Sequence, residues 1–293
     1  MSTLLCFGLG YSARHYVAAF GTRFSRIIGT IRARDKADAI NADGIEALVF
    51  DSRPAIADAI GVCDAILVSA PPVENSDPVL AAFDDAIARA AKLRSIVYLS
   101  TVGVYGNHDG RWVDEKTAPN PTKARGRARL AAETAWQSLG ARTGKSVAVL
   151  RLAGIYGPGR NALAQLANGT AKRIVKPGQV FSRIHVADIA QVIDAAFALQ
   201  ANGIFNVGDD EAVPPQDVIA FAADLLQLPP PAEIPFAEAA KNLSPMALSF
   251  YAECRRVRND RIKGELGIRL RYPTYREGLR ALHAAGEGVH NRF

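Results

Sequence analysis

The stretch LLCFGLGYSARHYVAAF, residues 4–20, decides the fold class because an apolar run leads through closely spaced glycines into a helical pattern. The apolar run before Gly8 predicts a short buried strand, and ARHYVAAF predicts a helix. Gly8, Gly10 and Ala13 have the spacing G-x-G-x-x-A. Gly8 permits a tight turn, Gly10 lets the backbone approach a pyrophosphate, and Ala13 keeps the helix close to the strand.

This strand, loop and helix together predict a dinucleotide-binding site. The first amides of a helix carry no intrahelical partner and can hold phosphates, so Tyr11 and Ser12 belong to the same expected site. A glycine turn without a ligand is the alternative, but the context that the motif requires is present in full.

Apolar runs continue to alternate with helical patterns through the first half of the chain. The further expected strands are RIIGTI, ALVF, AILVSA, SIVYLS and VAVLRLAG, and helical stretches such as DPVLAAFDDAIARAAK and ARLAAETAWQSLGAR lie between them. Short, continuously apolar strands separated by helices predict a parallel sheet that is covered on both faces. The predicted fold class is α/β, a doubly wound parallel sheet of the Rossmann type.

The alternating pattern loosens after Tyr156. Residues 157–182 are rich in Gly, Pro and Lys, IFNVGDD predicts one more strand, and PPPAEIP has the composition of a rigid linker. We expect a dinucleotide-binding Rossmann domain formed by residues 1–156 with 183–208. Residues 157–182 with 209–293 are expected to form a smaller C-terminal lobe on the substrate side.

Composition is that of an ordinary globular chain and argues against several function classes. The 293 residues are 49% hydrophobic, and no stretch reaches the roughly 18 apolar residues of a membrane span. The N-terminus lacks the basic region and cleavage site of a signal peptide. Cys6, Cys63 and Cys254 have neither disulfide nor metal-ligand spacing, which favours reduced thiols, a cytoplasmic location and no metal site. The net charge of +6 comes without a nucleic-acid-binding motif, so we interpret it as a basic solvated surface.

The end of the second expected strand indicates which dinucleotide binds. A site for NAD usually has an acid there, about 20 residues after the glycines, to bind the ribose 2′-hydroxyl. The sequence at this point, residues 29–34, is GTIRAR and contains no acid. A guanidinium can bind a 2′-phosphate, so we predict NADP(H), with Arg32 as the main ligand and Thr30 assisting. A solvent-facing arginine is the alternative for Arg32. Ser69 and Ala70, at the end of AILVSA, complete the expected cofactor site.

Five further segments occur in a fixed order along the chain: LSTVGVYG (99–106), RLAGIYGPGR (151–160), RIHVADIA (183–190), FNVGDDE (205–211) and RVRNDRIKGELG (256–267). Together they resemble segments of the extended short-chain dehydrogenase/reductases, the NAD(P)-dependent epimerase/dehydratase family, and in particular its atypical members. Five ordered motifs over almost the whole chain are more specific than any one of them. The glycine loop departs from the family's G-x-x-G-x-x-G, because Phe7 and Ala13 stand at its first and third glycine positions.

The resemblance implies a catalytic Ser or Thr, a Tyr and a Lys. Thr101 matches the first of these, but the Tyr-x-x-x-Lys position aligns with Arg125 and Arg129. Residues four apart share a helix face, so both arginines are expected to point at the cofactor. Arg129 can bind the ribose hydroxyls. A guanidinium keeps its proton at neutral pH and is therefore a poor general acid, so Arg125 is expected to clamp an anion or a carbonyl oxygen.

Other interpretations stay open at these positions. Both arginines can belong to a solvated helix face, and Thr101 can be a strand-end residue that bonds to the backbone. If the chemistry is retained, another group must move the proton. Tyr105 and Tyr156 follow strand ends that face the ligand crevice in this kind of sheet, and we include Tyr105 among the candidate catalytic residues. A packed aromatic with a satisfied hydroxyl is the alternative for each tyrosine.

The favoured function is an NADP(H)-binding, short-chain-type oxidoreductase or epimerase. Its expected partner is a small anionic substrate, such as a sugar nucleotide or a carboxylate, and neither nucleic acid nor membrane is expected to bind. The alternative is a non-catalytic NADP(H)-binding sensor or scaffold that kept the fold and lost the proton donor. The resemblance also implies a homodimer, for which the alanine-rich helices expected at 79–92 and 127–139 can supply the interface.

Overall fold

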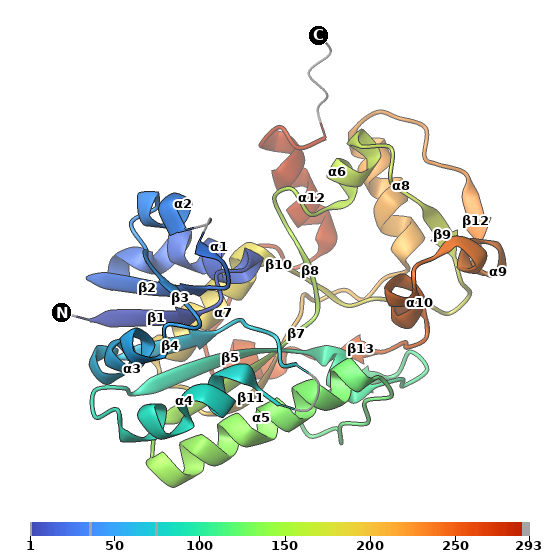
Figure 1. Cartoon of the computed structure of the whole chain (residues 1–293). Coiled ribbons are helices and arrows are strands. Elements are labelled where there is room, and N and C mark those ends of the chain that lie inside the picture. Colours follow the sequence, from blue (N-terminus) through green and yellow to red (C-terminus); the bar gives the residue numbers. More distant parts are fainter. Residues whose placement is uncertain (1, 35–36, 74–75, 289–293) are drawn as a thin grey trace.

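A seven-stranded parallel sheet forms the centre of the molecule in the computed structural model, which describes residues 2–34, 37–73 and 76–288 (Figure 1). Its strand order is β11-β7-β5-β4-β1-β2-β3. The strands are β1 (Thr3–Phe7), β2 (Arg26–Ile31), β3 (Glu46–Val49), β4 (Ala65–Val68), β5 (Ser95–Thr101), β7 (Ser146–Leu152) and β11 (Gly203–Val207). Every neighbouring pair is parallel, which confirms the predicted doubly wound α/β fold.

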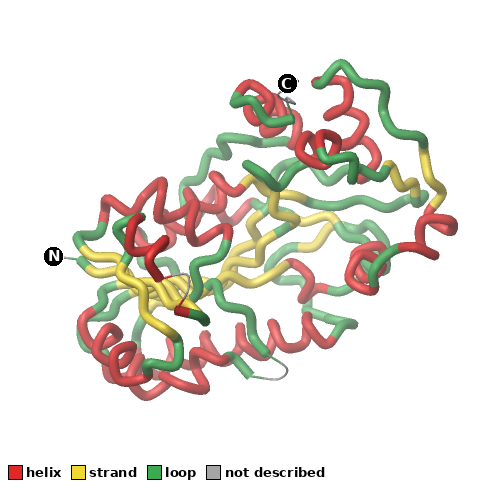
Figure 2. Tube along the Cα trace, turned by 45° about the horizontal axis from the view of Figure 1, so that its top comes forward, coloured by secondary structure: helices red, strands yellow, loops and turns green. Residues whose placement is uncertain are grey.

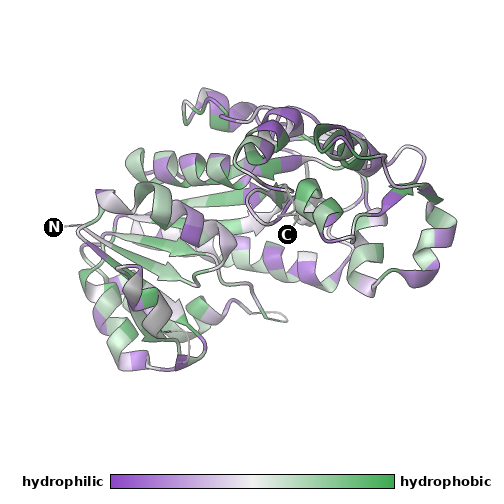
Figure 3. Ribbon diagram, turned by 90° about the horizontal axis from the view of Figure 1, so that it is seen from above, coloured by the Kyte–Doolittle hydropathy of each residue, from purple (hydrophilic) through white to green (hydrophobic). Residues whose placement is uncertain are grey.

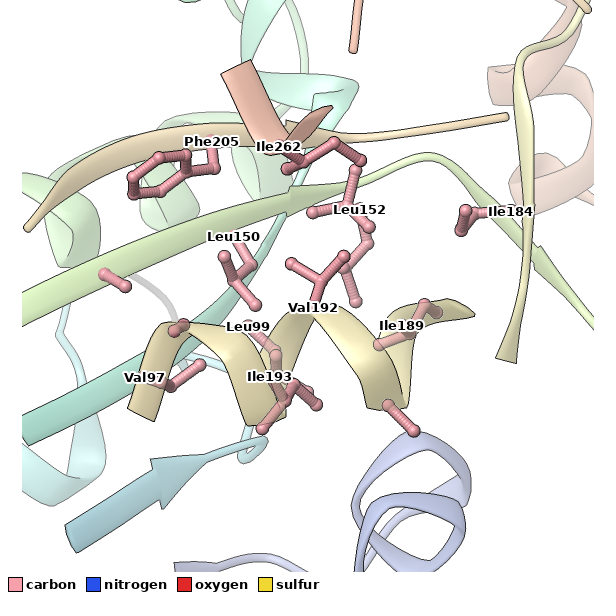
Figure 4. Close-up of a cluster of buried hydrophobic side chains, with 14 of the residues drawn as sticks. Val97, Leu99, Leu150, Leu152, Ile184, Ile189, Val192, Ile193, Phe205 and Ile262 are labelled. Atoms are coloured by element: carbon pink, nitrogen blue, oxygen red, sulfur yellow. The ribbon is translucent and has the colours of Figure 1, made fainter. Parts of the chain in front are cut away.

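Helices cover both faces of the sheet, which explains why its inner strands are apolar throughout. Along β1, Leu4 and Cys6 pack in one core cluster, whereas Leu5 and Phe7 pack in another on the opposite face. The first face carries α1 (Tyr11–Phe20), α2 (Ala37–Ala42), α7 (Val186–Ala198) and α11 (Asp260–Gly264); the second carries α3 (Arg53–Val62), α4 (Pro78–Arg89) and α5 (Ala124–Thr143). Figure 4 shows α7 placing Ile189, Val192 and Ile193 against side chains of β5, β7 and β11.

A smaller lobe extends from one end of the sheet (Figures 1 and 2). A short parallel pair, β8 with β10, leads into it. The elements of this region are β8 (Gly154–Tyr156), α6 (Ala162–Ala167), β9 (Arg173–Val175), β10 (Arg183–His185), α8 (Pro215–Leu225), β12 (Glu233–Pro235), α9 (Phe236–Ala239), α10 (Pro245–Tyr251) and α12 (Tyr275–Ala284). The lobe has a core of its own in which Tyr156, Leu163, Ile219 and Leu279 meet.

The structure of two segments in the C-terminal third differs from what the sequence predicts. The linker interpretation of PPPAEIP is wrong at its end, because residues 233–235 form β12 and pair in parallel with β9. Farther on, β13 (Arg256–Val257) pairs with β6 (Trp112–Val113), and Val257 and Ile262 pack in the main core rather than in the lobe. The proposed domain boundaries stay a prediction.

Hydropathy follows these layers. Figure 3 shows hydrophobic residues along the central strands, whereas the surrounding helices carry both hydrophilic and hydrophobic residues. Within the residues that the structure describes, no helix has both the length and the apolar character that a membrane crossing requires.

Candidate cofactor and substrate site

A cavity of about 720 Å³ lies at the carboxyl ends of the parallel strands. One wall consists of residues that follow β1, β4, β5 and β7, and the opposite wall comes from residues 180–183 and 247–257. β1 lies between β2 and β4, so successive strands leave it in opposite directions. Ligands of doubly wound sheets bind at this switch point, outside the carboxyl ends of the strands.

The glycine loop after β1 forms one end of the cavity, through Gly10, Tyr11 and Ser12. Gly8 has a φ of 85°, the left-handed conformation that the motif predicts for its tight turn. Helix α1 has neither a side-chain cap nor an acid in its first turn. The amides of Tyr11, Ser12 and Ala13 donate to no other described residue. They can therefore hold a pyrophosphate, and the loop fits the group that its sequence predicts.

Side chains from β2 and β4 support this loop. The Thr30 hydroxyl accepts a hydrogen bond from the Gly8 amide at 3.0 Å, and the Ser69 hydroxyl donates to the Gly8 carbonyl at 2.7 Å. The amide of Ala70 donates to the Phe7 carbonyl at 2.9 Å, close beside Gly8. Thr30 is buried beneath the glycine loop. Its side chain therefore supports the loop backbone and does not reach a phosphate.

The remaining cofactor candidates differ in exposure. Ala13 is fully buried against the sheet, as the close packing of helix and strand requires. Arg32 is exposed directly after β2 and does not line the cavity. This is the edge of the sheet at which an adenosine ribose lies when a dinucleotide binds across a switch point.

The end of β5 and the start of α5 bring three candidate catalytic residues to the cavity: Thr101, Arg125 and Arg129. The Thr101 hydroxyl accepts a hydrogen bond from the Gly103 amide at 3.1 Å, which leaves its proton available to a ligand. Arg129 donates through Nη1 to the Leu99 carbonyl at 2.7 Å and to the Tyr98 hydroxyl at 3.1 Å. Its other nitrogens make no hydrogen bond to a described residue. Arg125 is exposed in the first turn of α5.

A buried ion pair fixes α5 against the sheet beneath these residues. Glu133 and Arg151 are each 1% exposed, and the Arg151 Nη2 lies 2.7 Å from the Glu133 Oε2. Arg151 also donates through Nε to both carboxylate oxygens. Ser100, at the end of β5, donates its hydroxyl to the Glu133 Oε1. The pair thereby joins β5, α5 and β7 just below Thr101 and Arg129.

The two tyrosines that were expected at the ligand crevice turn their hydroxyls away from it. Tyr105 is fully buried in a short 3-10 turn, Val102–Tyr105, and donates to the Asn206 Oδ1 at 2.8 Å. It does not line the cavity. Tyr156 lines the cavity, but its hydroxyl is directed to the Thr274 carbonyl at 3.4 Å. The expectation that Tyr105 acts on a substrate is therefore wrong. Its phenol is buried and donates its proton to Asn206, so it cannot reach a ligand in the cavity.

Sequence reasoning missed most of the wall that faces α5. Its cations include Arg183, which donates through Nη1 to the Phe181 carbonyl at 2.9 Å and whose pKa is lowered by burial. Arg160 lies over the ring of Tyr11, with its guanidinium carbon 5.8 Å from the ring centre. Tyr11 in turn donates its hydroxyl proton to the Pro158 carbonyl at 2.9 Å, so the start of α1, directly after the glycine loop, contacts the lobe.

The charge of the cavity is unbalanced. Five cations line it with no carboxylate within 4 Å among the described residues: Lys123, Arg125, Arg129, Arg160 and Arg183. Among the described residues that line the cavity, Glu253 is the only one with a carboxylate, and it is paired with Arg255 at 2.8 Å. Unpaired cations that share a concave site attract anionic ligands. No cluster of three or more potential metal-ligating side chains occurs in the part of the chain that the structure describes.

Comparison with protein families gives a match that agrees with this geometry. The profile described as "NAD dependent epimerase/dehydratase family" matches residues 57–208. Among curated proteins, a 3-diazoavenalumate denitrifying reductase of Streptomyces sp. is 32% identical over 139 residues. This alignment covers 45% of each chain, so the present chain spans less than half of that relative.

Solved structures extend the likeness to the whole chain. A functionally unknown conserved protein from Silicibacter pomeroyi is 52% identical, with a TM-score of 0.89 over 98% of this chain and 100% of that chain. The dTDP-glucose 4,6-dehydratase of Bacillus anthracis, solved in complex with NAD, has a TM-score of 0.75 at 16% identity over 96% and 95% of the two chains. At that identity the likeness concerns the fold alone.

Proposed function

We propose that this chain, which belongs to the NAD-dependent epimerase/dehydratase family, binds NADP(H) and acts as an oxidoreductase or epimerase on a small anionic substrate. One observation carries the proposal. A single cavity joins the free amides of α1 to the Thr101 hydroxyl and to five cations without a carboxylate partner among the described residues. This combination provides places for a pyrophosphate, for a substrate oxygen and for a negatively charged group.

In this proposal the cofactor is held along one edge of the sheet. The amides that begin α1 bind the pyrophosphate, and Arg32 binds the 2′-phosphate through charged hydrogen bonds. The nitrogens of Arg129 that are not bonded to Leu99 or Tyr98 bind the nicotinamide ribose. Bound NADP(H) supplies the hydride chemistry.

The substrate side is built from Thr101, Arg125 and Arg183. Thr101 donates its free hydroxyl proton to a substrate oxygen. Arg125, at the position where the family has its tyrosine, stabilises negative charge on that oxygen or on an adjacent carboxylate. Arg183 supplies a second cation. Burial lowers the pKa of its guanidinium, and the charge of Asp209 opposes that shift.

A proton source that faces the cavity is Tyr251, at the end of α10. Its hydroxyl makes no hydrogen bond to a described residue, and the residue lines the cavity. Burial raises the pKa of this phenol, and the charge of Arg183 opposes that rise. We infer that Tyr251 serves where the resemblance places a tyrosine on α5. The reductase from Streptomyces is named for a reduction, which supports hydride transfer as the reaction class.

A second candidate function is a non-catalytic NADP(H)-binding sensor. It is favoured by the arginines at positions 125 and 129 together with the orientation of Tyr105 and Tyr156, whose hydroxyls are directed away from the cavity. A sensor needs the amides of α1 and Arg32 but no proton donor.

Turnover distinguishes the two candidates. Absorbance at the nicotinamide band is followed while the full chain and NADPH are mixed with a panel of carbonyl compounds and conjugated acids that carry negative charge. We expect oxidation with at least one acid, and Arg125→Ala is expected to lower kcat/KM for it by about a hundredfold. Tight NADPH binding without oxidation by any member of the panel would favour the sensor.

We also propose a homodimer through α4 and α5, which lie side by side on one face of the sheet and are joined by the Arg142–Asp84 ion pair. Ala131 and Ala135 are exposed on α5, and small side chains permit close approach of another helix. Light scattering at micromolar concentration is expected to give twice the chain mass. The mass of a single chain would refute this arrangement.

A further inference from the structure

Helix α10 presents an apolar ring to the cavity beside Arg125. Phe250 is 52% exposed, yet it lines the cavity together with its neighbours Ser249 and Tyr251. The guanidinium carbon of Arg125 lies 5.4 Å from the centre of the Phe250 ring. No residue of α10 is buried, so core packing does not explain where this ring is placed. An apolar ring beside a guanidinium in a concave site provides a surface for a ligand.

The position of Phe250 places this surface at the reacting end of the cavity. Arg125 occupies the position that the tyrosine of the Tyr-x-x-x-Lys pattern has in the resemblance, and Thr101 lines the same cavity. A group that accepts or gives hydride must lie between these residues and the nicotinamide. Because Phe250 contacts Arg125, its ring covers the substrate near the reacting carbon rather than at a distant end.

Besides aromatic and cationic groups, this wall carries two serine hydroxyls, and both are engaged: the Ser182 hydroxyl accepts from the Val257 amide and the Ser249 hydroxyl donates to the Met246 carbonyl. The Phe181 and Tyr251 rings pack edge to face with centres 5.6 Å apart, and Arg183 donates to the carbonyl of Phe181. Among the described residues that line the cavity there is no Asn, Gln, Asp or His, and Glu253 is committed to Arg255. Guanidinium groups donate hydrogen bonds but cannot accept them. The hydroxyls of a sugar ring donate as well as accept, and this wall offers them serine and tyrosine hydroxyls but no amide side chain and no free carboxylate among the described residues, so it is poorly matched to a sugar.

We infer that the substrate is a planar conjugated carboxylate, of the aryl or arylacrylate class, rather than a sugar nucleotide. The inference rests on the proposed function, since it assumes that this cavity is the substrate site. The ring of the substrate packs against Phe250, and its carboxylate accepts paired hydrogen bonds from a guanidinium of the lobe-side wall. Arg183 is the half-buried guanidinium of that wall that forms no ion pair within 4 Å with a described carboxylate, whereas Arg255 is paired with Glu253.

Saturation-transfer NMR on the full chain, with and without NADPH, tests this inference. The planar probes are benzoate, trans-cinnamate and 2-naphthoate; cyclohexanecarboxylate is the matched acid without a flat ring, and UDP-glucose represents the sugar nucleotides. We expect the planar acids to bind at least about tenfold more tightly than cyclohexanecarboxylate, because a flat ring stacks on Phe250 and on guanidinium groups. The glucose protons of UDP-glucose are expected to receive no saturation.

Variants on α10 localise the effect. Phe250→Ala is expected to weaken binding of the best planar acid about tenfold, and Phe250→Tyr is expected to restore it. Met246→Ala, at an exposed position of the same helix that does not line the cavity, is the control and is expected to change nothing.

Three results would overturn the inference: no saturation of any planar acid, equal binding of cyclohexanecarboxylate, or Phe250→Ala binding the acids as well as the unchanged chain does. NADPH binding is recorded in the same samples. Acid binding without NADPH binding would contradict the proposed cofactor while upholding the substrate class, and the reverse would contradict the substrate class alone.

Discussion

Replacing Glu133 by Gln tests the buried ion pair that holds α5 under the site. Glu133 and Arg151 are each 1% exposed and share a forked contact through Nε and Nη2 of the arginine. Removing one partner of a buried pair costs about 3–5 kcal/mol, because the other charge stays buried and uncompensated. Glutamine keeps one acceptor oxygen, so we expect the lower end, about 3 kcal/mol of unfolding free energy.

The assay is equilibrium unfolding in urea, in which this loss is expected to lower the transition midpoint by about 1 M with an unchanged slope. The chain offers a matched control in Arg26–Glu46, where Nε and Nη2 also meet one carboxylate but the side chains are 47% and 44% exposed. Glu46→Gln is expected to cost less than about 1 kcal/mol, because solvent screens that pair. Equal losses for the two variants would refute the argument that burial sets the magnitude.

Three further predictions concern pH, the cofactor loop and the proton source. Burial lowers the pKa of His185 to about 4, so the unfolded chain binds the extra proton as pH falls from about 6.5 to about 4, and stability is lost across that window. The free energy of unfolding is expected to fall by up to about 3 kcal/mol across this pH range for the unchanged chain, and by clearly less for His185→Asn. If the two stability curves ran parallel, His185 would not be the group that causes the loss. Gly8→Ala forces a Cβ into a left-handed position 3.2 Å from the Ala70 amide nitrogen, and calorimetry is expected to show at least about tenfold weaker NADPH binding. Gly61→Ala, where a Cβ meets nothing within 4 Å, is the control, and equal affinities of the two variants would count against the loop. Tyr251→Phe is expected to lower kcat about a hundredfold without altering NADPH affinity, and unchanged turnover would remove Tyr251 as the proton source.

The sheet and the cofactor loop could be predicted because their signals are local. The residues of β1 are apolar at every position from Leu4 to Phe7, since helices cover both faces of the sheet. The spacing of Gly8 and Gly10 likewise indicates a tight turn with a closely approached backbone, a conformation that other residues adopt poorly. The alignment of Arg125 and Arg129 on one helix face follows from helix periodicity, and both residues line the cavity.

The lobe-side wall could not be predicted because its residues meet only in the folded chain. Arg183 and Phe250 are 67 residues apart in the sequence. Arg183 begins the segment RIHVADIA, but nothing in that segment marks the arginine as a ligand residue, and Phe250 belongs to none of the five segments. Tyr105 shows the opposite case. Tyr105 does follow a strand end, as the sequence predicts, but the 3-10 turn after β5 directs its hydroxyl to Asn206. Strand-end rules locate the edge of a sheet, whereas the turn decides where a side chain points.

The preference of this site for NADP(H) is tested most directly by a parallel calorimetric titration of the chain with NADPH, NADP⁺, NADH and NAD⁺, repeated with Arg32→Ala. We predict that the two NADP forms bind at least about tenfold more tightly than the NAD forms, and that Arg32→Ala removes this preference while NAD binding is retained. Equal affinities for NADPH and NADH in the unchanged chain, or no binding of any form, would contradict the assignment of this site to NADP(H).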